Sequence, residues 1–260
     1  MDLTTLALLL VVLGVLVGRA VLRERRDYAR FRRLRTTAAR VRVYRRWTIE
    51  QVVILGGLAA ATVLATWRDA DAVLDAARGL PSVAGAVGWF ATSTGTGFAV
   101  GAGIAAIVGG LLPALLLRRE GMDEIPAVGD IRPLLPRVRA ELPYGAALAT
   151  GAGVIEELLF RLAVPALVFR LVPDPLVAFG AAALVFGLLH LYQGAIGVAF
   201  STVLGVVFTA MYVLSGSIWL PIVAHALLDL RSLVLIPIAV GGAWRTEPPR
   251  RSTPPARPVP

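Results

Sequence analysis

Residues 175–228 read PLVAFGAAALVFGLLHLYQGAIGVAFSTVLGVVFTAMYVLSGSIWLPIVAHALL, an apolar stretch without a single Asp, Glu, Lys or Arg. Its only titratable side chains are His190, His225 and two tyrosines. A helix needs about 20 consecutive apolar residues to cross a lipid bilayer. The stretch is long enough for more than one such helix, so we expect consecutive membrane-spanning helices here.

The composition of the whole chain also favours membrane insertion. Of its 260 residues 57% are hydrophobic, and the mean hydropathy is +0.75. A soluble domain has about 45–50% apolar residues, interrupted by charges at short intervals. Residues 51–67 and 79–117 are free of charged side chains. We therefore predict an all-α, polytopic membrane protein with about seven transmembrane helices, at residues 3–22, 48–67, 96–117, 144–170, 175–191, 194–214 and 217–240.

These helices divide the chain into four parts. Residues 1–47 hold a first transmembrane helix and an Arg-rich cytoplasmic loop, and residues 48–142 hold two spans with their connecting loops. Residues 143–240 form the membrane core with its polar residues, and the Pro- and Arg-rich tail 241–260 is expected to be disordered. Within the second part, residues 79–95 could be either interfacial or re-entrant.

The positive charge is concentrated in one segment. Residues 23–46 hold eleven arginines against Glu24 and Asp27, which accounts for the net charge of +9. Cytoplasmic loops carry such an excess, so we place this segment and the C-terminus in the cytoplasm and the N-terminus outside, in a multi-pass protein of the cell membrane. Contact of the segment with anionic lipid headgroups would follow. We expect no nucleic-acid partner. The chain has no cysteine, which excludes disulfides and thiolate metal sites.

Two adjacent carboxylates lie in the middle of the predicted span 144–170. Ionisable residues inside a span are costly and are therefore functional candidates. Glu157 and Arg161 are four residues apart, which places them on one helix face and predicts an internal ion pair. Glu156 points about 100° away from Glu157 and has no local partner. A lone carboxyl group in such surroundings can serve as a general acid or base.

The two histidines of the chain both lie in apolar helices. His190 ends one predicted span, and His225 lies within another. Asp229 follows His225 by four residues and shares its helix face, so it can orient the imidazole or join it at a site. Arg231 also falls within this span, and it either pairs with a carboxylate on another helix or marks a shorter span.

These residues resemble the motifs of the CPBP family of intramembrane proteases. That family includes the type II CAAX prenyl proteases and bacterial bacteriocin-processing or self-immunity (Abi-like) proteins. Its pattern is Glu-Glu-x-x-x-Arg, Phe-x-x-x-His and His-x-x-x-Asn/Asp. Here the three pieces are Glu156-Glu157-Leu-Leu-Phe-Arg161, Phe186-Gly-Leu-Leu-His190 and His225-Ala-Leu-Leu-Asp229, in the same order. Leu162 stands where the family often has Gly, and the last motif position is Asp229 here rather than Asn.

The resemblance implies a peptidase with a defined set of catalytic residues. Glu156 and His190 would hold and deprotonate a water, and His225 and Asp229 would polarise the scissile carbonyl. Glu157, Arg161 and Phe186 would support the site. Family members are known both as metalloproteases and as metal-free glutamate proteases. The residues permit either, since Glu156, His190 and His225 could also ligate a divalent metal such as zinc.

The function that this resemblance implies is endopeptidase cleavage of a membrane-associated protein or peptide. The sequence leaves two alternatives from other classes. One is a non-catalytic scaffold or bacteriocin-immunity protein with the same fold. The other is a transporter that uses the same residues as a proton relay. No inverted repeat is evident in the sequence, which disfavours a transporter.

Overall fold

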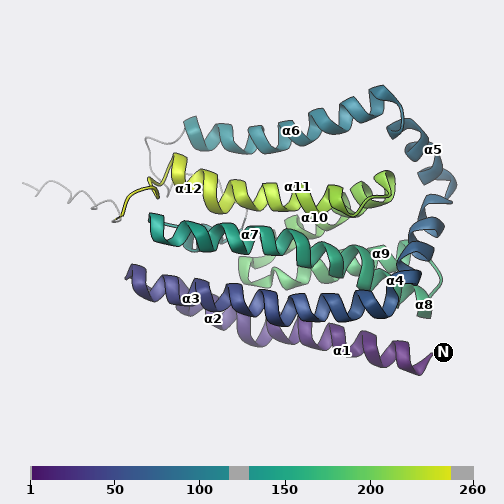
Figure 1. Cartoon of the computed structure of the whole chain (residues 1–260), viewed down its shortest axis with the longest axis horizontal. Coiled ribbons are helices and arrows are strands. Elements are labelled where there is room, and N and C mark those ends of the chain that lie inside the picture. Colours follow the sequence, from purple (N-terminus) through teal and green to yellow (C-terminus); the bar gives the residue numbers. More distant parts are fainter. Residues whose placement is uncertain (1, 117–128, 247–260) are drawn as a thin grey trace, which may run out of the picture.

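The computed structural model describes residues 2–116 and 129–246, and every regular element in these two ranges is helical. In the first half of the chain, the two long helices Leu3–Phe31 and Thr37–Arg78 are followed by a short helix and a longer one (Figure 1). Their elements are α1 (Leu3–Arg19), η1 (Ala20–Glu24), α2 (Arg25–Phe31), α3 (Thr37–Glu50), η2 (Gln51–Gly56), α4 (Gly57–Arg78), α5 (Pro81–Phe90) and α6 (Ser93–Leu116).

The second half holds the predicted polar residues. Its elements are η4 (Arg132–Leu134), η5 (Arg139–Glu141), α7 (Leu142–Glu157), η6 (Leu158–Ala163), α8 (Val164–Leu171), α9 (Pro175–Leu189), η7 (Leu191–Gln193), α10 (Gly194–Ser215), α11 (Trp219–Leu230), η8 (Arg231–Leu235) and α12 (Ile236–Ala239). The elements η1, η2, η6 and η8 are π-helical turns inside longer helices.

Several of these helices are long and apolar enough to cross a membrane. Within the described residues, four meet that description: Leu3–Phe31, Thr37–Arg78, Leu191–Ser215 and Trp219–Ala239. Pro175–Leu189 is apolar but shorter. Helices of this length and composition are consistent with a polytopic membrane protein, and the count of about seven spans stays a prediction.

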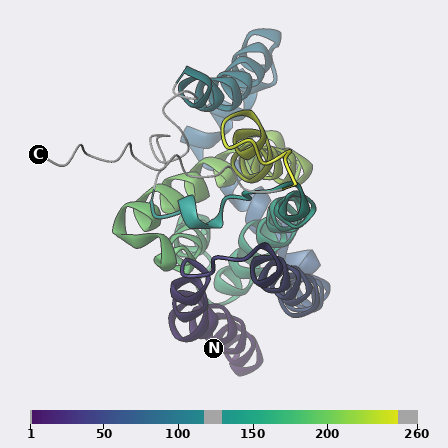
Figure 2. The same ribbon diagram turned by 90° about the vertical axis from the view of Figure 1, so that its left-hand side faces the viewer.

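The long helices lie roughly side by side, and their ends gather at two opposite ends of the molecule (Figure 1). One end holds the α2–α3 turn, the start of α7 and the end of α12. There Arg139 donates its backbone N–H to the carbonyl of Arg245 at 2.9 Å. At the opposite end the side chain of Arg170, on α8, pairs with Asp69, on α4. Figure 2, seen along the bundle, places α6 at the periphery.

The main core joins the N-terminal helices to the helix that carries the two glutamates. Leu9, Val12 and Leu16 of α1 are buried against α8 and α9, next to Phe160 and Phe186. Close packing of these large apolar side chains fills the space between the helices and avoids voids. The N-terminal helix is therefore part of the same packed unit as the polar residues.

A buried arginine ties α3 to the segment before α7. Arg40 is 1% exposed, and its Nε donates to Glu141 Oε1 at 2.9 Å. It also donates to the backbone carbonyls of Pro133 and Leu135, each at 3.1 Å, while Phe31 lies under its guanidinium at 4.4 Å. A buried ion pair with further hydrogen bonds fixes geometry, since removal of one partner would strand the other charge. This pair sets the position at which α7 begins.

One expectation changes in the light of the structure. The Arg-rich segment 23–47 is largely helical rather than a loop, with a turn only at 32–36, because η1, α2 and α3 continue the neighbouring spans. The residues 79–95 contain the short helix α5 and the first turn of α6. Most of the tail 241–260, predicted to be disordered, lies outside the described residues.

Candidate active site in the C-terminal helices

Glu157 is the most enclosed of the polar residues. It ends α7, where the helix continues into the π-helical turn η6, and its side chain is 0% exposed. Arg161, also 0% exposed, places Nε 2.9 Å from Glu157 Oε2, and its Nη2 donates to Glu157 Oε1 at 3.3 Å. This is the ion pair that the i, i+4 spacing predicts. Two aromatic rings, Phe186 and Phe208, face the guanidinium at 5.4 and 5.7 Å.

His225 is fixed on three sides. Its Nδ1 lies 2.8 Å from Glu157 Oε1, its ring stacks on Phe208 with centroids 4.9 Å apart, and its Nε2 lies 3.6 Å from Asp229 Oδ2. An ionised carboxylate can only accept hydrogen bonds, so the proton at this contact is on Nδ1. Glu157 therefore sets which nitrogen of His225 faces the rest of the site, and that nitrogen is Nε2.

A backbone carbonyl group orients the ring of His190, and as in His225 the contact is made by Nδ1. It caps the end of α9, and its Nδ1 lies 2.9 Å from the carbonyl oxygen of Phe186. A carbonyl oxygen accepts, so Nδ1 again carries the proton and Nε2 is left with its lone pair. The Phe186 ring lies between the two imidazoles, 5.0 Å from His190 and 5.9 Å from His225.

Glu156 differs from its neighbour in having no polar partner of its own. Its Oε2 is buried and makes no hydrogen bond within the described part of the chain. Its carboxyl group interacts electrostatically with His225 and Asp229, and His190 interacts with the same two residues. A buried polar atom without a partner is costly unless it has a function or holds a water.

The segment that contains these residues has a family match. Residues 139–231 match the sequence model of the family described as "Type II CAAX prenyl endopeptidase Rce1-like". Residues 139–231 form an Rce1-like domain. No curated protein and no solved structure matches the sequence.

The Rce1-like domain includes every residue predicted for the site: Glu156, Glu157, Arg161, Phe186, His190, His225 and Asp229. It starts in η5 and ends at the first residue of η8. The helices α1–α6 lie outside it, although α1 and α4 pack against it.

The donors of the Rce1-like domain do not form a ready metal site. In residues 2–116 and 129–246, no three His, Asp or Glu side chains are grouped so that they could hold a metal ion. A catalytic zinc site requires three such ligands around one point. The set Glu156, His190 and His225 is not placed in this way, and we derive no step through a metal.

Sequence reasoning missed two features of the site. It assigned Glu157 to Arg161 alone and named Asp229 as a residue that can orient His225 or join it at the site, whereas the close contact of His225 is with Glu157, across 68 residues. It also left out Phe208, whose ring covers His225 at a plane angle of 17°. Neither contact has a signal in local spacing, because both depend on how separate helices pack.

Arg231 contributes a charge close to the site. It opens η8 and interacts electrostatically with Asp229, two residues earlier. Asp229 lies on the same continuous helix as Arg231, so it is not the carboxylate on another helix that was one of the two explanations for Arg231.

Proposed function

We propose that this chain is an intramembrane endopeptidase that hydrolyses a peptide bond of a membrane-associated protein or peptide. Membership of residues 139–231 in the Rce1-like family suggests a CAAX-type protease. The apolar helices of membrane-spanning length support a location in the membrane. The observation that carries the proposal is the contact between Glu157 and His225, which unites two of the three family motifs within a buried site.

In the proposed mechanism Glu156 is the general base. Its carboxyl group has a buried oxygen without a partner, and a water held there and at His190 Nε2 would lose a proton to Glu156 as it attacks the carbonyl carbon. The same proton would then pass to the leaving amine. Enclosure of the carboxylate favours this role, since it excludes competing water.

His225 would stabilise the oxyanion. To donate from Nε2 it must carry a second proton, and the carboxylates of Glu157 and Asp229 on either side of the ring would balance the charge of the imidazolium. Hydrogen-bond donors that are fixed before reaction lower the barrier because they need no reorganisation. Glu157 thereby becomes a positioning residue for His225, and Arg161 holds Glu157.

The protein's orientation is also a proposal. The Arg-rich α2–α3 turn would lie in the cytoplasm and the N-terminus outside, in the cell membrane. His190 would then be near the cytoplasmic surface, and substrates would reach it from that side. Anionic lipids would contact the arginines of α2 and α3.

The test of the proposal compares the full-length protein with its Glu156→Gln variant in liposomes. Gln keeps the size of the side chain and cannot act as a base. We expect the loss of Glu156 to reduce peptide cleavage by at least about 10²-fold. Thr150→Ala, an exposed change on the same helix, serves as the matched control. Proteomics of membranes from cells with each variant would identify the substrate, and full activity of Glu156→Gln would refute the assignment.

A further inference from the structure

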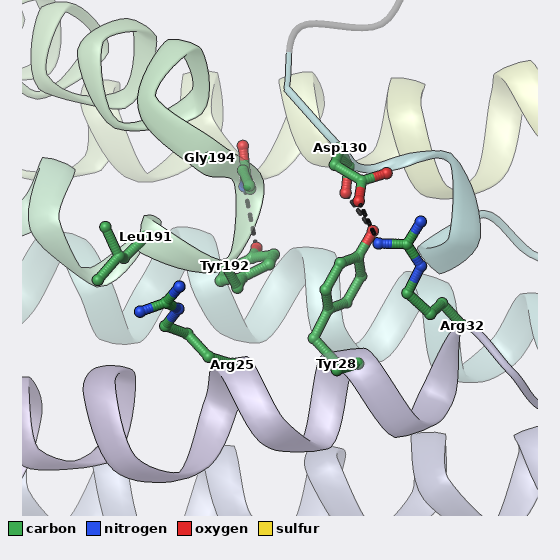
Figure 3. Close-up of a pocket in the computed structure, with 9 residues that line it drawn as sticks. Arg25, Tyr28, Arg32, Asp130, Leu191, Tyr192 and Gly194 are labelled. Carbon is green, nitrogen blue, oxygen red and sulfur yellow. Dashed lines mark hydrogen bonds and ion pairs between the residues drawn. The ribbon is translucent and has the colours of Figure 1, made fainter.

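A groove that contains charged and tyrosine side chains lies beside the proposed active site, between α2 and the segment that follows His190 (Figure 3). Its volume is about 280 Å³. One wall belongs to the Rce1-like domain and the other to the N-terminal helix, which the family match does not cover. The lining residues used below are Arg25, Tyr28, Arg32, Asp130, Tyr192 and Gly194.

Aromatic rings connect this groove to His190. The ring of Tyr28 lies 5.5 Å from that of Tyr192, and Tyr192 stacks on His190 with centroids 6.1 Å apart and planes at 29°. The groove is thus separated from a proposed catalytic histidine by one side chain. A molecule bound in it would lie next to the reacting group.

The groove continues past Gly194. A second hollow, of about 520 Å³, shares Asp130, Gln193 and Gly194 with the first and extends to Ile196. A trough of this kind suits an extended peptide, because it offers length rather than one enclosed chamber.

Among the described charged side chains that line the groove, one arginine is free to bind a ligand. On this side of the molecule Arg19, Arg23 and Arg46 each lie within ion-pair distance of a carboxylate. Within the groove Arg32 pairs with Asp130 at 3.1 Å. Arg25 is exposed, and no hydrogen bond or ion pair joins it to another described residue.

A second donor stands near Arg25. The hydroxyl of Tyr192 accepts a hydrogen bond from Gln193 Nε2 at 3.0 Å, which leaves its own proton to donate. Figure 3 shows the Arg25 guanidinium extending toward the segment of Leu191 and Tyr192. A guanidinium on one wall and a phenol on the other match a carboxylate, which guanidinium groups bind through two parallel hydrogen bonds.

We propose that this groove is a substrate subsite in which Arg25 and Tyr192 bind a carboxylate of the peptide while the peptide passes His190. The inference rests on the proposed function and adds to it a preference for an acidic group in the substrate. It also assigns a binding role to the N-terminal helix, outside the Rce1-like domain. The carboxylate belongs either to an acidic side chain or to the C-terminus of the peptide.

The test measures binding, so that it does not depend on turnover. The full chain with Glu156→Gln is placed in nanodiscs of phosphatidylcholine. The probes are lipid-anchored fluorescent peptides that differ only in Glu against Gln, or in a free against an amidated C-terminus. We expect the carboxylate peptide to bind about tenfold more tightly, as one charge-assisted contact would give. Arg25→Gln should abolish this preference, and Arg26→Gln, an exposed neighbour outside the groove, should preserve it.

The possible outcomes distinguish a failure of the proposed subsite from a failure of the proposed peptidase function. Equal binding of the paired peptides to the Arg25-containing protein, or an unchanged preference in Arg25→Gln, overturns the subsite. The same holds if Arg25→Gln alters only binding to phosphatidylglycerol vesicles, which would make Arg25 a lipid contact. Carboxylate-dependent binding without any cleavage by the unmodified chain would refute the peptidase and leave the subsite in place.

Discussion

At the scale of single residues, Glu157 is shared by two partners that the chain places far apart. Arg161 lies one turn further along the same helix, and His225 comes from α11. Both contacts are buried, so each partner compensates for the cost of removing the carboxylate from water. The contact between Glu157 and His225 also determines that His225 presents Nε2 to the site. Glu157 therefore matters both for stability and for the chemistry proposed for the site.

Glu157→Gln should therefore impair both stability and activity. Loss of the carboxylate strands the Arg161 guanidinium, at a cost of about 3–5 kcal/mol, and leaves the imidazolium of His225 without its closest counter-charge. We expect a lower thermal midpoint and a fall in turnover of about 10²- to 10⁴-fold. Thermal unfolding and peptide cleavage would be measured on the same preparation. Because the chain has only two histidines, ¹⁵N-histidine spectra can follow the His225 ring directly. An unchanged His225 signal would contradict the positioning role.

The donors of the site also lead to a prediction about metal removal. No three ligands of the kind that hold metals are grouped in the described residues. We expect prolonged treatment with a strong chelator to leave peptide cleavage within about twofold of its starting rate, since zinc enzymes of three-ligand type lose their reactive water with the metal. Elemental analysis before and after treatment is the companion measurement. A loss of activity that zinc restores would establish a metal-dependent mechanism.

At the scale of helices, the site depends on how closely α7 approaches α11. Gly153 lies at a point of close approach between the two helices. A Cβ at this position would lie 2.7 Å from the backbone nitrogen of Ala226, next to His225. The absence of a side chain at Gly153 thus lets the helix of Glu157 reach the helix of His225.

Gly153→Ala should separate these two helices. Added volume in a packed contact costs about 1–3 kcal/mol, and the shift would lengthen the hydrogen bond between Glu157 and His225. We expect at least tenfold lower activity and reduced thermal stability. Gly180→Ala on α9 is the matched control, because a Cβ there meets nothing within 4 Å and Ala favours a helix. Equal activity of the two variants would show that the close approach is not required.

The helices were predictable from sequence to a greater degree than the contacts between them. Apolar runs located α10 and the continuous helix Trp219–Ala239 within a few residues, since burial in lipid imposes length and composition. The same reasoning treated residues 37–47 as a loop, because their arginines break the apolar pattern, although α3 runs through them. The π-helical turn η6, which begins directly after Glu157, has no signature in composition. The family motifs located Glu156 and His190 as candidates, while the contact of Glu157 with His225 required the packing.

At the scale of the whole molecule, arginines mark one end of the bundle. The α2–α3 turn lies there with the segment before α7, to which Arg40 binds. The opposite end holds the junction of α4 and α5. The groove beside His190 is on the arginine-rich side, as its residues Arg25 and Arg32 show. If this side faces the cytoplasm, the proposed substrate also approaches from the cytoplasm.

This orientation can be tested with single cysteines, since the chain has none of its own. Ala38, in α3, and Ser82, in α5, are both exposed and lie toward opposite ends of the bundle. We expect a membrane-impermeant maleimide, added to the outside of intact cells, to label Ser82→Cys and to reach Ala38→Cys only after the cells are opened. Ala182→Cys, at a fully buried position of α9, is the control for nonspecific labelling. The reverse pattern would invert the topology and move substrate access to the outer surface. Equal labelling of both cysteines in intact cells would mean that the two ends are not separated by the membrane, and the spans would have to be redrawn.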